Sequence, residues 1–279
     1  MPQLSFVPGP GIRVAVRDDP PERPDAPAGQ AALYDLLRRD GHRAADLDAL
    51  AARHPEYRLP IVTLAAALRY AAGDHGAHTH GLLRELFDHC ADPGTHPFLT
   101  THLTDDAHVR IPVAGSLSLT LPFGRDAVGL MLAEVERGAG RLDGAVDAAQ
   151  RVGAQPGTAL YLAARYLAAD RASDVLALTA DIDGDDVIHG DDVTALLLTL
   201  RGAALTRVGM VEGARELLNA LLAPRTRAPA VRHFALRQRA DLHARCGRQA
   251  AARRDLERIL AEDPDDADAA RRLGALGGR

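Results

Sequence analysis

The sequence predicts a mostly α-helical protein, an α-α superhelix of stacked helical hairpins, with small β-hairpin elements in its N-terminal half. Three observations support this fold class. Aromatic residues make up only 4% of the 279 residues and Trp is absent, so the core must consist of Ala, Leu and Val, which suits closely packed helices. Apolar residues recur with helical spacing over most of the chain. The C-terminal half also repeats itself at intervals of 30 to 39 residues.

Residues 1–29 are predicted to form an extended segment and a linker. Two short apolar runs, LSFV and IRVAV, are divided by Pro-Gly-Pro-Gly, which favours a tight turn and so a small hairpin. The following stretch, RDDPPERPDAPAG, is rich in Pro and charge and has little to bury, which is typical of a linker.

Residues 30–107 are predicted to form an N-terminal helical region. Its apolar spacing indicates helices near residues 30–40, 43–54, 58–73 and 77–91, each ended by a Gly or Pro. Residues 92–107 show no period and are expected to be irregular.

A β-hairpin connector is predicted over residues 108–124. The strands VRIPV and SLSLTLP flank an Ala-Gly turn, and Leu117, Leu119 and Leu121 alternate with polar residues, as in a strand with one buried face. Helical spacing resumes at Arg125, so residues 125–279 are predicted to form the repeat domain.

The repeat domain contains four helix-turn-helix units that align by their turns. The turn residues are Gly140, Asp170, Gly209 and Gly247, separated by 30, 39 and 38 residues. A small residue occupies the same place in the first helix of each unit, namely Ala133, Ala163, Gly202 and Ala240. The second helices carry a matching small or medium residue, listed in order as Ala145, Val175, Ala214 and Ala252.

This pattern resembles the tetratricopeptide repeat family, in degenerate form. The family has a repeat of about 34 residues, with small residues where the two helices cross and Gly at the turn. The resemblance implies that ADAARRLGALG, after Pro264, is a short capping helix over the last open face. The units lack the family's aromatic residue near the start of the first helix, and a generic helical bundle or another solenoid is the alternative.

The resemblance also implies a concave groove lined by the first helices of successive units, where a partner protein or peptide would bind. Positions one turn apart predict a lining of Met131, Glu134, Arg137, Tyr161, Thr199, Arg207, Phe234, Arg237, Asp241 and Arg245. Since a guanidinium group binds carboxylates through several donors, Arg207, Arg237 and Arg245 favour an acidic partner segment. The alternative for these arginines is a solvated helix face.

A second hypothesis is a metal-dependent or ligand-sensing protein that uses residues 75–108. Seven of the 12 histidines lie there, and the metal candidates are His75, His78, His80, His102 and His108. Imidazole groups at short spacing can bind zinc, but the spacing matches no standard metalloenzyme pattern. A solvated connector is therefore the default, and no metal site is assigned.

The segment DIDGDDVIHGDD partly resembles a calcium-binding loop. Asp181, Asp183, Asp185 and Asp192 stand at ligand positions, but the turn glycine is replaced by Asp186. An acidic loop that caps the next helix explains the segment without calcium.

Several classes of function are disfavoured. The formal net charge of −5 argues against nucleic-acid binding, and no run of 18 apolar residues indicates a membrane span. All 33 basic residues are Arg, as expected from a GC-rich genome. No phosphate-binding glycine loop, serine elbow or Cys-His pair is found. We therefore expect a cytoplasmic, non-catalytic scaffold without a cofactor.

Overall fold

The structure is a computed structural model, and it describes residues 3–5, 7, 9–18, 27–39, 41–89, 91–115, 117–153, 155–182, 190–224 and 227–277. The chain divides into two compact units, Met1–Thr158 and Ala159–Arg279. Each unit is described separately. The predicted boundary between residues 124 and 125 differs from this division, because the helices that follow it pack with the N-terminal helices.

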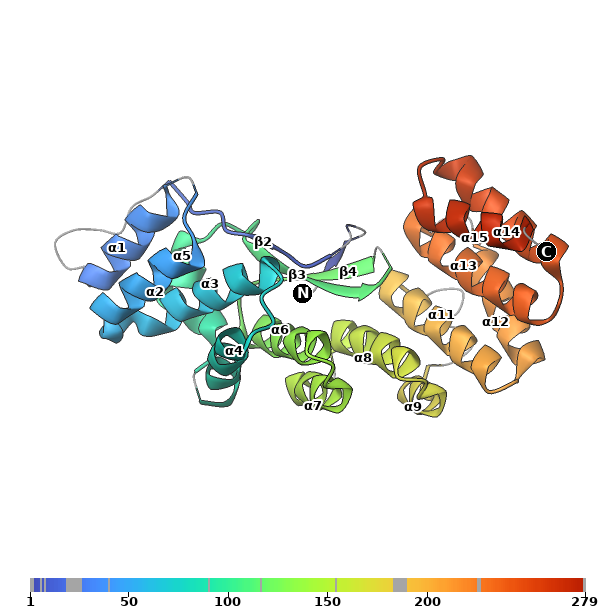
Figure 1. Ribbon diagram of the computed structural model, residues 1–279, viewed down its shortest axis with the longest axis horizontal. Coiled ribbons are helices and arrows are strands. Elements are labelled where there is room, and N and C mark those ends of the chain that lie inside the picture. The colour runs from blue at the N-terminus through green and yellow to red at the C-terminus, as the bar shows by residue number, and fades with distance from the viewer. Residues whose placement is uncertain are drawn as a thin grey trace. The chain divides into compact units, whose positions relative to one another are not determined.

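The first unit contains the four predicted N-terminal helices. They are α1 (Ala28–Leu37), α2 (Ala44–Arg53), α3 (Arg58–Ala71) and α4 (Ala77–His89) (Figure 1). Helix α3 packs on both α2 and α4, and residues from Pro60 to Ala67 are buried all round it. The predicted linker falls mainly on residues 19–26, which lie outside the described residues.

Two short helical turns and one short helix were not expected from the sequence. The 3-10 turns are η1 (Pro55–Tyr57) and η2 (Pro93–Thr95), and the helix is α5 (Pro97–His102). Pro97 occupies the first turn of α5, and the His96 side chain accepts a hydrogen bond from the Phe98 amide at 3.1 Å. With only 6 residues, α5 is too short to show a period, so the prediction of irregular structure over residues 92–107 was wrong there.

A four-stranded antiparallel sheet forms in the order β1-β4-β3-β2 (Figure 1). Its central hairpin, β3 (His108–Ala114) and β4 (Leu117–Leu121), is the predicted one, and Leu117, Leu119 and Leu121 are buried as expected. The outer strands are β1 (Gln3–Ser5) and β2 (Gly11–Arg13).

The predicted N-terminal hairpin is therefore wrong. Strand β1 pairs with β4 and β2 pairs with β3, so the first two strands flank the central hairpin rather than each other. Side chains stabilise this arrangement: Arg110 donates to the Gly9 carbonyl at 3.2 Å, and Ser118 donates to the Val7 carbonyl at 2.9 Å. Local turn chemistry could not reveal these partners because they lie more than 100 residues away.

The helical pairs begin in the first unit with α6 (Arg125–Gly138) and α7 (Leu142–Val152), which pack on each other, and α6 also packs on α3 and α4. The second pair, α8 (Pro156–Ala168) and α9 (Ala172–Leu178), starts at the boundary between the units. The later pairs are α11 (Asp192–Arg207) with α12 (Val211–Leu222), and α13 (Pro229–Arg245) with α14 (Gln249–Glu262).

The backbone confirms the predicted turns. Gly140, Gly209 and Gly247 have φ values of +77°, +82° and +72°, and Asp170 has a φ of +58°. A residue in this left-handed region ends one helix and reverses the chain into the next. The small residues at the predicted crossing positions are also buried; Gly202 lies so close to Leu218 that an added Cβ would stand 2.9 Å from the Leu218 Cγ.

The last helix, α15 (Ala267–Gly277), is the predicted capping helix, and it packs on α14. Ala269 is fully buried in a cluster with residues of α13 and α14, and Leu273 and Leu276 pack on the same cluster. Within the described part of the chain, no helix is both long and apolar enough to cross a membrane.

Candidate functional site

Half of the predicted groove lining is buried. Met131, Tyr161 and Thr199 have no exposed surface, and Glu134 and Phe234 are 2% and 8% exposed. These five residues were assigned wrongly to an open surface. Helices α6 and α11 contain long runs of consecutive buried residues, from Ala127 to Val135 and from Ala195 to Leu200, so spacing along the helix cannot separate an open face from a packed one.

The predicted charged residues are mostly paired within the protein. Arg137 donates two hydrogen bonds of 2.9 Å to the buried Glu134 carboxylate. Arg207 contacts the Leu167 carbonyl and lies 3.4 Å from an Asp170 carboxylate oxygen.

Arg237, one of the three arginines that were expected to favour an acidic partner, instead binds the start of the capping helix. Arg237 contacts Asp266 and lies 3.4 Å from Asp268, and its side chain is only 14% exposed. A second ion pair has its carboxylate on α13 and its arginine on α15: Asp241 accepts hydrogen bonds of 2.8 and 2.9 Å from Arg272. These ion pairs fix α15 against α13.

Among the predicted groove residues, Arg245 remains exposed. No carboxylate within the described ranges forms an ion pair with it. Arg245 is therefore the predicted groove arginine that is best placed to meet a partner.

The histidines of residues 75–108 lie in separate environments. His80 is hydrogen-bonded to Glu136 at 2.6 Å, and His102 is buried beside Gln30 and the Phe98 ring. His75 packs against Gly138, His78 is exposed, and His108 bonds a backbone carbonyl at 2.7 Å. In the described portion of the chain, none of these histidines belongs to a group of three metal-ligating side chains.

A different group, His233, Asp263 and Asp266, has ligand atoms within 4.8 Å of one another. Two of its three members already have other partners. His233 is hydrogen-bonded to Glu262 at 2.9 Å, and Asp266 contacts Arg237 and caps α15 by accepting from the Ala269 amide at 2.9 Å. Because an arginine competes for the same oxygens, this group is better suited to joining α13, α14 and α15 than to holding a cation.

The calcium hypothesis falls partly on Asp183 and Asp185, which lie outside the described residues. Asp181 is exposed, and Asp192 is in the first turn of α11. The neighbouring Asp191 accepts a hydrogen bond from the Thr194 amide at 2.8 Å. This confirms the expected capping of the next helix by an acidic residue.

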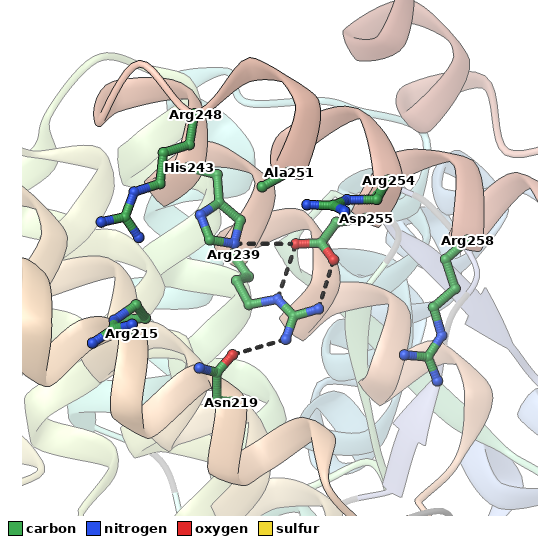
Figure 2. Close-up of a pocket in the computed structure, with 9 residues that line it drawn as sticks. All are labelled: Arg215, Asn219, Arg239, His243, Arg248, Ala251, Arg254, Asp255 and Arg258. Atoms are coloured by element: carbon green, nitrogen blue, oxygen red, sulfur yellow. Dashed lines mark hydrogen bonds and ion pairs between the residues drawn. The ribbon is translucent and has the colours of Figure 1, made fainter.

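The second unit contains an arginine-rich depression that spacing did not predict. It has a volume of about 590 Å³ and lies between the second helices α12 and α14, with α13 also contributing (Figure 2). We call it the arginine depression. Its lining consists of Arg215, Asn219, Arg239, His243, Arg248, Ala251, Arg254, Asp255 and Arg258.

One hydrogen-bonded group forms the centre of the depression. Asp255 is 8% exposed and receives two hydrogen bonds from Arg239, at 2.9 and 2.6 Å. A third donor of Arg239 bonds the Asn219 side-chain oxygen at 2.8 Å, so residues of α12 and α14 fix this guanidinium group of α13 (Figure 2). The single carboxylate of the lining is thus used to neutralise Arg239.

The other arginines of the depression surround this centre. Arg215 contacts Glu212, and Arg258 lies 3.8 Å from Glu262. Arg248 and Arg254 are exposed and form no ion pair with any described carboxylate. Figure 2 shows Arg215 and Arg248 on one side of the central group and Arg258 on the other.

The electrostatic environment also affects His243. Burial lowers the pKa of its imidazole; Asp255, 3.9 Å away, raises it, but Arg239, Arg248 and Arg254 lower it further. The imidazole is therefore neutral at pH 7, and the positive charge of the depression comes from guanidinium groups.

A sequence signal for this site exists in α14 and the turn before it. The stretch RQAAARRDLERI carries Arg248, Arg254 and Arg258 on one side of the helix, but the other lining residues come from α13 and from α12 of the preceding pair. Only the packed structure joins Arg215 and Arg239 to them.

The chain is thus a series of helical pairs with a small antiparallel sheet in its first unit, and its last pair can be compared with a known repeat family. Residues 233–276 match the family model described as Tetratricopeptide repeat. This match extends from within α13 into α15, and the preceding helical pairs share with it a left-handed residue at the turn.

A solved structure supports the same fold over most of the chain. The crystal structure of the N-terminal domain of the EccA1 ATPase from the ESX-1 secretion system of Mycobacterium tuberculosis superposes with a TM-score of 0.58. The alignment covers 89% of this chain and 88% of that one, at 17% sequence identity, which is a likeness of fold. A search of curated proteins finds no significant match.

Proposed function

We propose that this protein is a non-catalytic interaction scaffold whose C-terminal helical pairs bind an acidic segment of a partner protein. The observation that carries the proposal is the series of helical pairs with a left-handed residue at each turn, ending in a matched tetratricopeptide repeat. Such stacks present extended surfaces made by several units, which suits recognition of another chain.

The exposed Arg245 supports an acidic partner on the side of the first helices. A guanidinium group that is accessible and unpaired by any described carboxylate can bind an incoming carboxylate without first breaking an internal contact. The structural neighbour is a domain of an ATPase, but a likeness of fold assigns no ATP hydrolysis and no role in secretion to this chain.

The test begins with capture of partners from the native lysate by the tagged full chain, followed by mass spectrometry. Amine-reactive crosslinkers are unsuitable because the chain contains no Lys, so a photoreactive residue is placed at the exposed position 249, which leaves the Arg245 side chain in place. We expect a covalent adduct with the captured partner.

Affinity for the purified partner is then compared between the natural chain and Arg245→Glu. We expect binding to weaken about tenfold, since the change replaces an attraction with a repulsion. Arg39→Glu, at an exposed position in the first unit, is the matched control and should bind normally. An affinity that Arg245→Glu leaves unchanged, together with no adduct from the photoreactive residue, would contradict the proposal.

A further inference from the structure

We propose that the arginine depression between α12, α13 and α14 is a binding site for an acidic peptide segment that carries at least two carboxylates. This inference rests on the proposed scaffold function and names the surface and the chemistry of the partner. It places recognition on the second helices of two successive pairs, in addition to the first-helix face that carries Arg245.

The first argument is the charge of the lining. Five arginines and one carboxylate line the depression, and that carboxylate, Asp255, is bound to Arg239. The guanidinium groups of Arg248 and Arg254 have no carboxylate partner among the described residues. Because like charges gathered in a concave surface raise the local potential, an anionic ligand gains more here than on an open face.

The second argument is the preorganisation of the site. Asp255 and Asn219 hold Arg239 by three hydrogen bonds, so the base of the depression does not need to be ordered when a ligand binds. The surrounding arginines come from α12, the α13–α14 turn and α14, so they can meet carboxylates at separate points along an extended chain (Figure 2).

The third argument concerns what the lining lacks. Its nine residues include no Phe, Tyr or Trp and only one apolar residue, Ala251, and its single imidazole, on His243, is largely buried, so neither a large base-stacking platform nor an apolar anchor pocket is present. The formal charge of the chain is −5, which disfavours a polynucleotide partner. A volume of about 590 Å³ suits a few residues of an extended acidic peptide.

The surface is separate from the carboxylates of the capping helix. Asp266 and Asp268 bind Arg237, and Arg272 binds Asp241, on the part of α13 that faces α15. None of these five residues lines the arginine depression. The chain's own α15 therefore does not occupy the proposed site.

The test measures binding of a fluorescein-labelled hexaglutamate peptide to the full chain by fluorescence anisotropy, with hexaglutamine as the neutral control. We expect saturable binding of hexaglutamate that weakens as NaCl rises, and no binding of hexaglutamine. Equal binding of the two peptides, or no binding of hexaglutamate, would overturn the proposal.

Single charge reversals locate the site. Arg248→Glu and Arg254→Glu should each weaken hexaglutamate binding about tenfold. Arg253→Glu is the matched control, because it lies on the same helix, is exposed and makes the same change in net charge, but does not line the depression. Its affinity should stay within about twofold of the natural chain. An equal loss in all three variants would indicate a general charge effect and overturn the site.

Two competitors distinguish other anions. Inorganic tripolyphosphate and a single-stranded oligonucleotide are added to the hexaglutamate complex at equal charge concentration. Each should displace less of the labelled hexaglutamate than unlabelled hexaglutamate does. If either phosphate compound displaces more, the peptide assignment is overturned.

The proposal can fail separately from the scaffold function. If Arg254→Glu captures the natural partner with unchanged affinity, the arginine depression is not the partner site, although the scaffold function stands. If hexaglutamate binds as expected but the full chain captures no partner protein, the scaffold function fails.

Discussion

At the scale of single residues, the closeness of paired helices depends on side chains that are small enough at the crossing. Gly202 of α11 faces Leu218 of α12, and an added Cβ would lie 2.9 Å from the Leu218 Cγ and 3.0 Å from its Cδ2. Leu218 is fully buried and cannot move aside without displacing other core atoms. The backbone conformation of Gly202 is ordinary helix, so space alone requires glycine here.

We expect Gly202→Ala to lower the free energy of unfolding by about 1 kcal/mol, because overpacking outweighs the better helix propensity of Ala. Gly274→Ala is the matched control: Gly274 lies in α15 with nothing within 4 Å of an added Cβ, so Ala should stabilise by about 0.5 kcal/mol. Urea denaturation measures both. A stabilising Gly202→Ala would show that α11 and α12 are less closely packed.

Ionisable residues at the helix ends make stability depend on pH. The pKa of Glu262 is held below its ordinary value of 4.5 chiefly by a hydrogen bond from Arg232; burial opposes this, and a hydrogen bond from His233 adds to it. The stabilisation is therefore present above about pH 4.5 and is lost as the pH falls through the lower folded-state pKa.

We expect Glu262→Gln to lower the free energy of unfolding at pH 7 by about 1 kcal/mol, since Arg232 loses a charged partner. The difference from the natural chain should shrink below pH 4.5, where the natural carboxyl also becomes neutral. Thermal unfolding from pH 3 to pH 7 measures this. A difference that stays constant across that range would mean that shape rather than charge is responsible.

At the scale of elements, the turn between paired helices requires one residue in the left-handed region. Gly140, Gly209 and Gly247 meet this requirement at no steric cost, whereas Asp170 adopts a φ of +58° with a Cβ present. Left-handed backbone costs an L-residue about 1 kcal/mol, less for Asp and Asn than for others. The α8–α9 turn is therefore the one described turn of the four in which a non-glycine residue bears this cost.

We expect Asp170→Gly to raise the free energy of unfolding by about 0.5 kcal/mol and Gly247→Ala to lower it by about 1 kcal/mol. Asp170→Asn separates backbone from charge, because Asn tolerates the same conformation and lacks the carboxylate 3.4 Å from Arg207. It should leave stability nearly unchanged, given that Asp170 is 90% exposed. If Asp170→Asn lowers the free energy of unfolding by as much as Asp170→Gly raises it, the ion pair with Arg207 contributes to stability.

At the scale of the whole molecule, helical stacks depend on contacts between neighbours, so a disturbance at the end should stay near the end. Ala269 is the fully buried residue of α15 and belongs to the same cluster as Leu236 of α13 and Leu256 of α14. Its replacement by a charged residue would place an unpaired charge in that cluster.

We expect Ala269→Asp to loosen α15 and to increase amide hydrogen exchange in α13, α14 and α15, at a cost of about 2 to 4 kcal/mol in local stability. Helices α1 to α4, which belong to the first unit, serve as the internal control and should exchange at the natural rate. Increased exchange throughout the first unit would show that the two units unfold together.

Much of the fold follows from the sequence because its rules are local. Helix spacing placed α1 to α4, the turn residues placed the helical pairs, and Leu117 to Leu121 identified the buried face of the central hairpin. The short helix α5 and the partners of β1 and β2 were not accessible in this way. A six-residue helix shows no period, and pairing between strands so far apart along the chain, such as Gln3 with Thr120 and Gly11 with Arg110, leaves no local pattern.

The sequence by itself therefore determined the paired-helix architecture, the left-handed turns and the capping helix, since each depends on residues close along the chain. Only the tertiary structure decided which side chains are open to a partner. It buried Tyr161 and Thr199, paired Arg237 with Asp266, and brought arginines of three elements around Asp255. The physical reason is that exposure and ion pairing depend on what packs against a helix, and that partner lies outside the helix's own sequence.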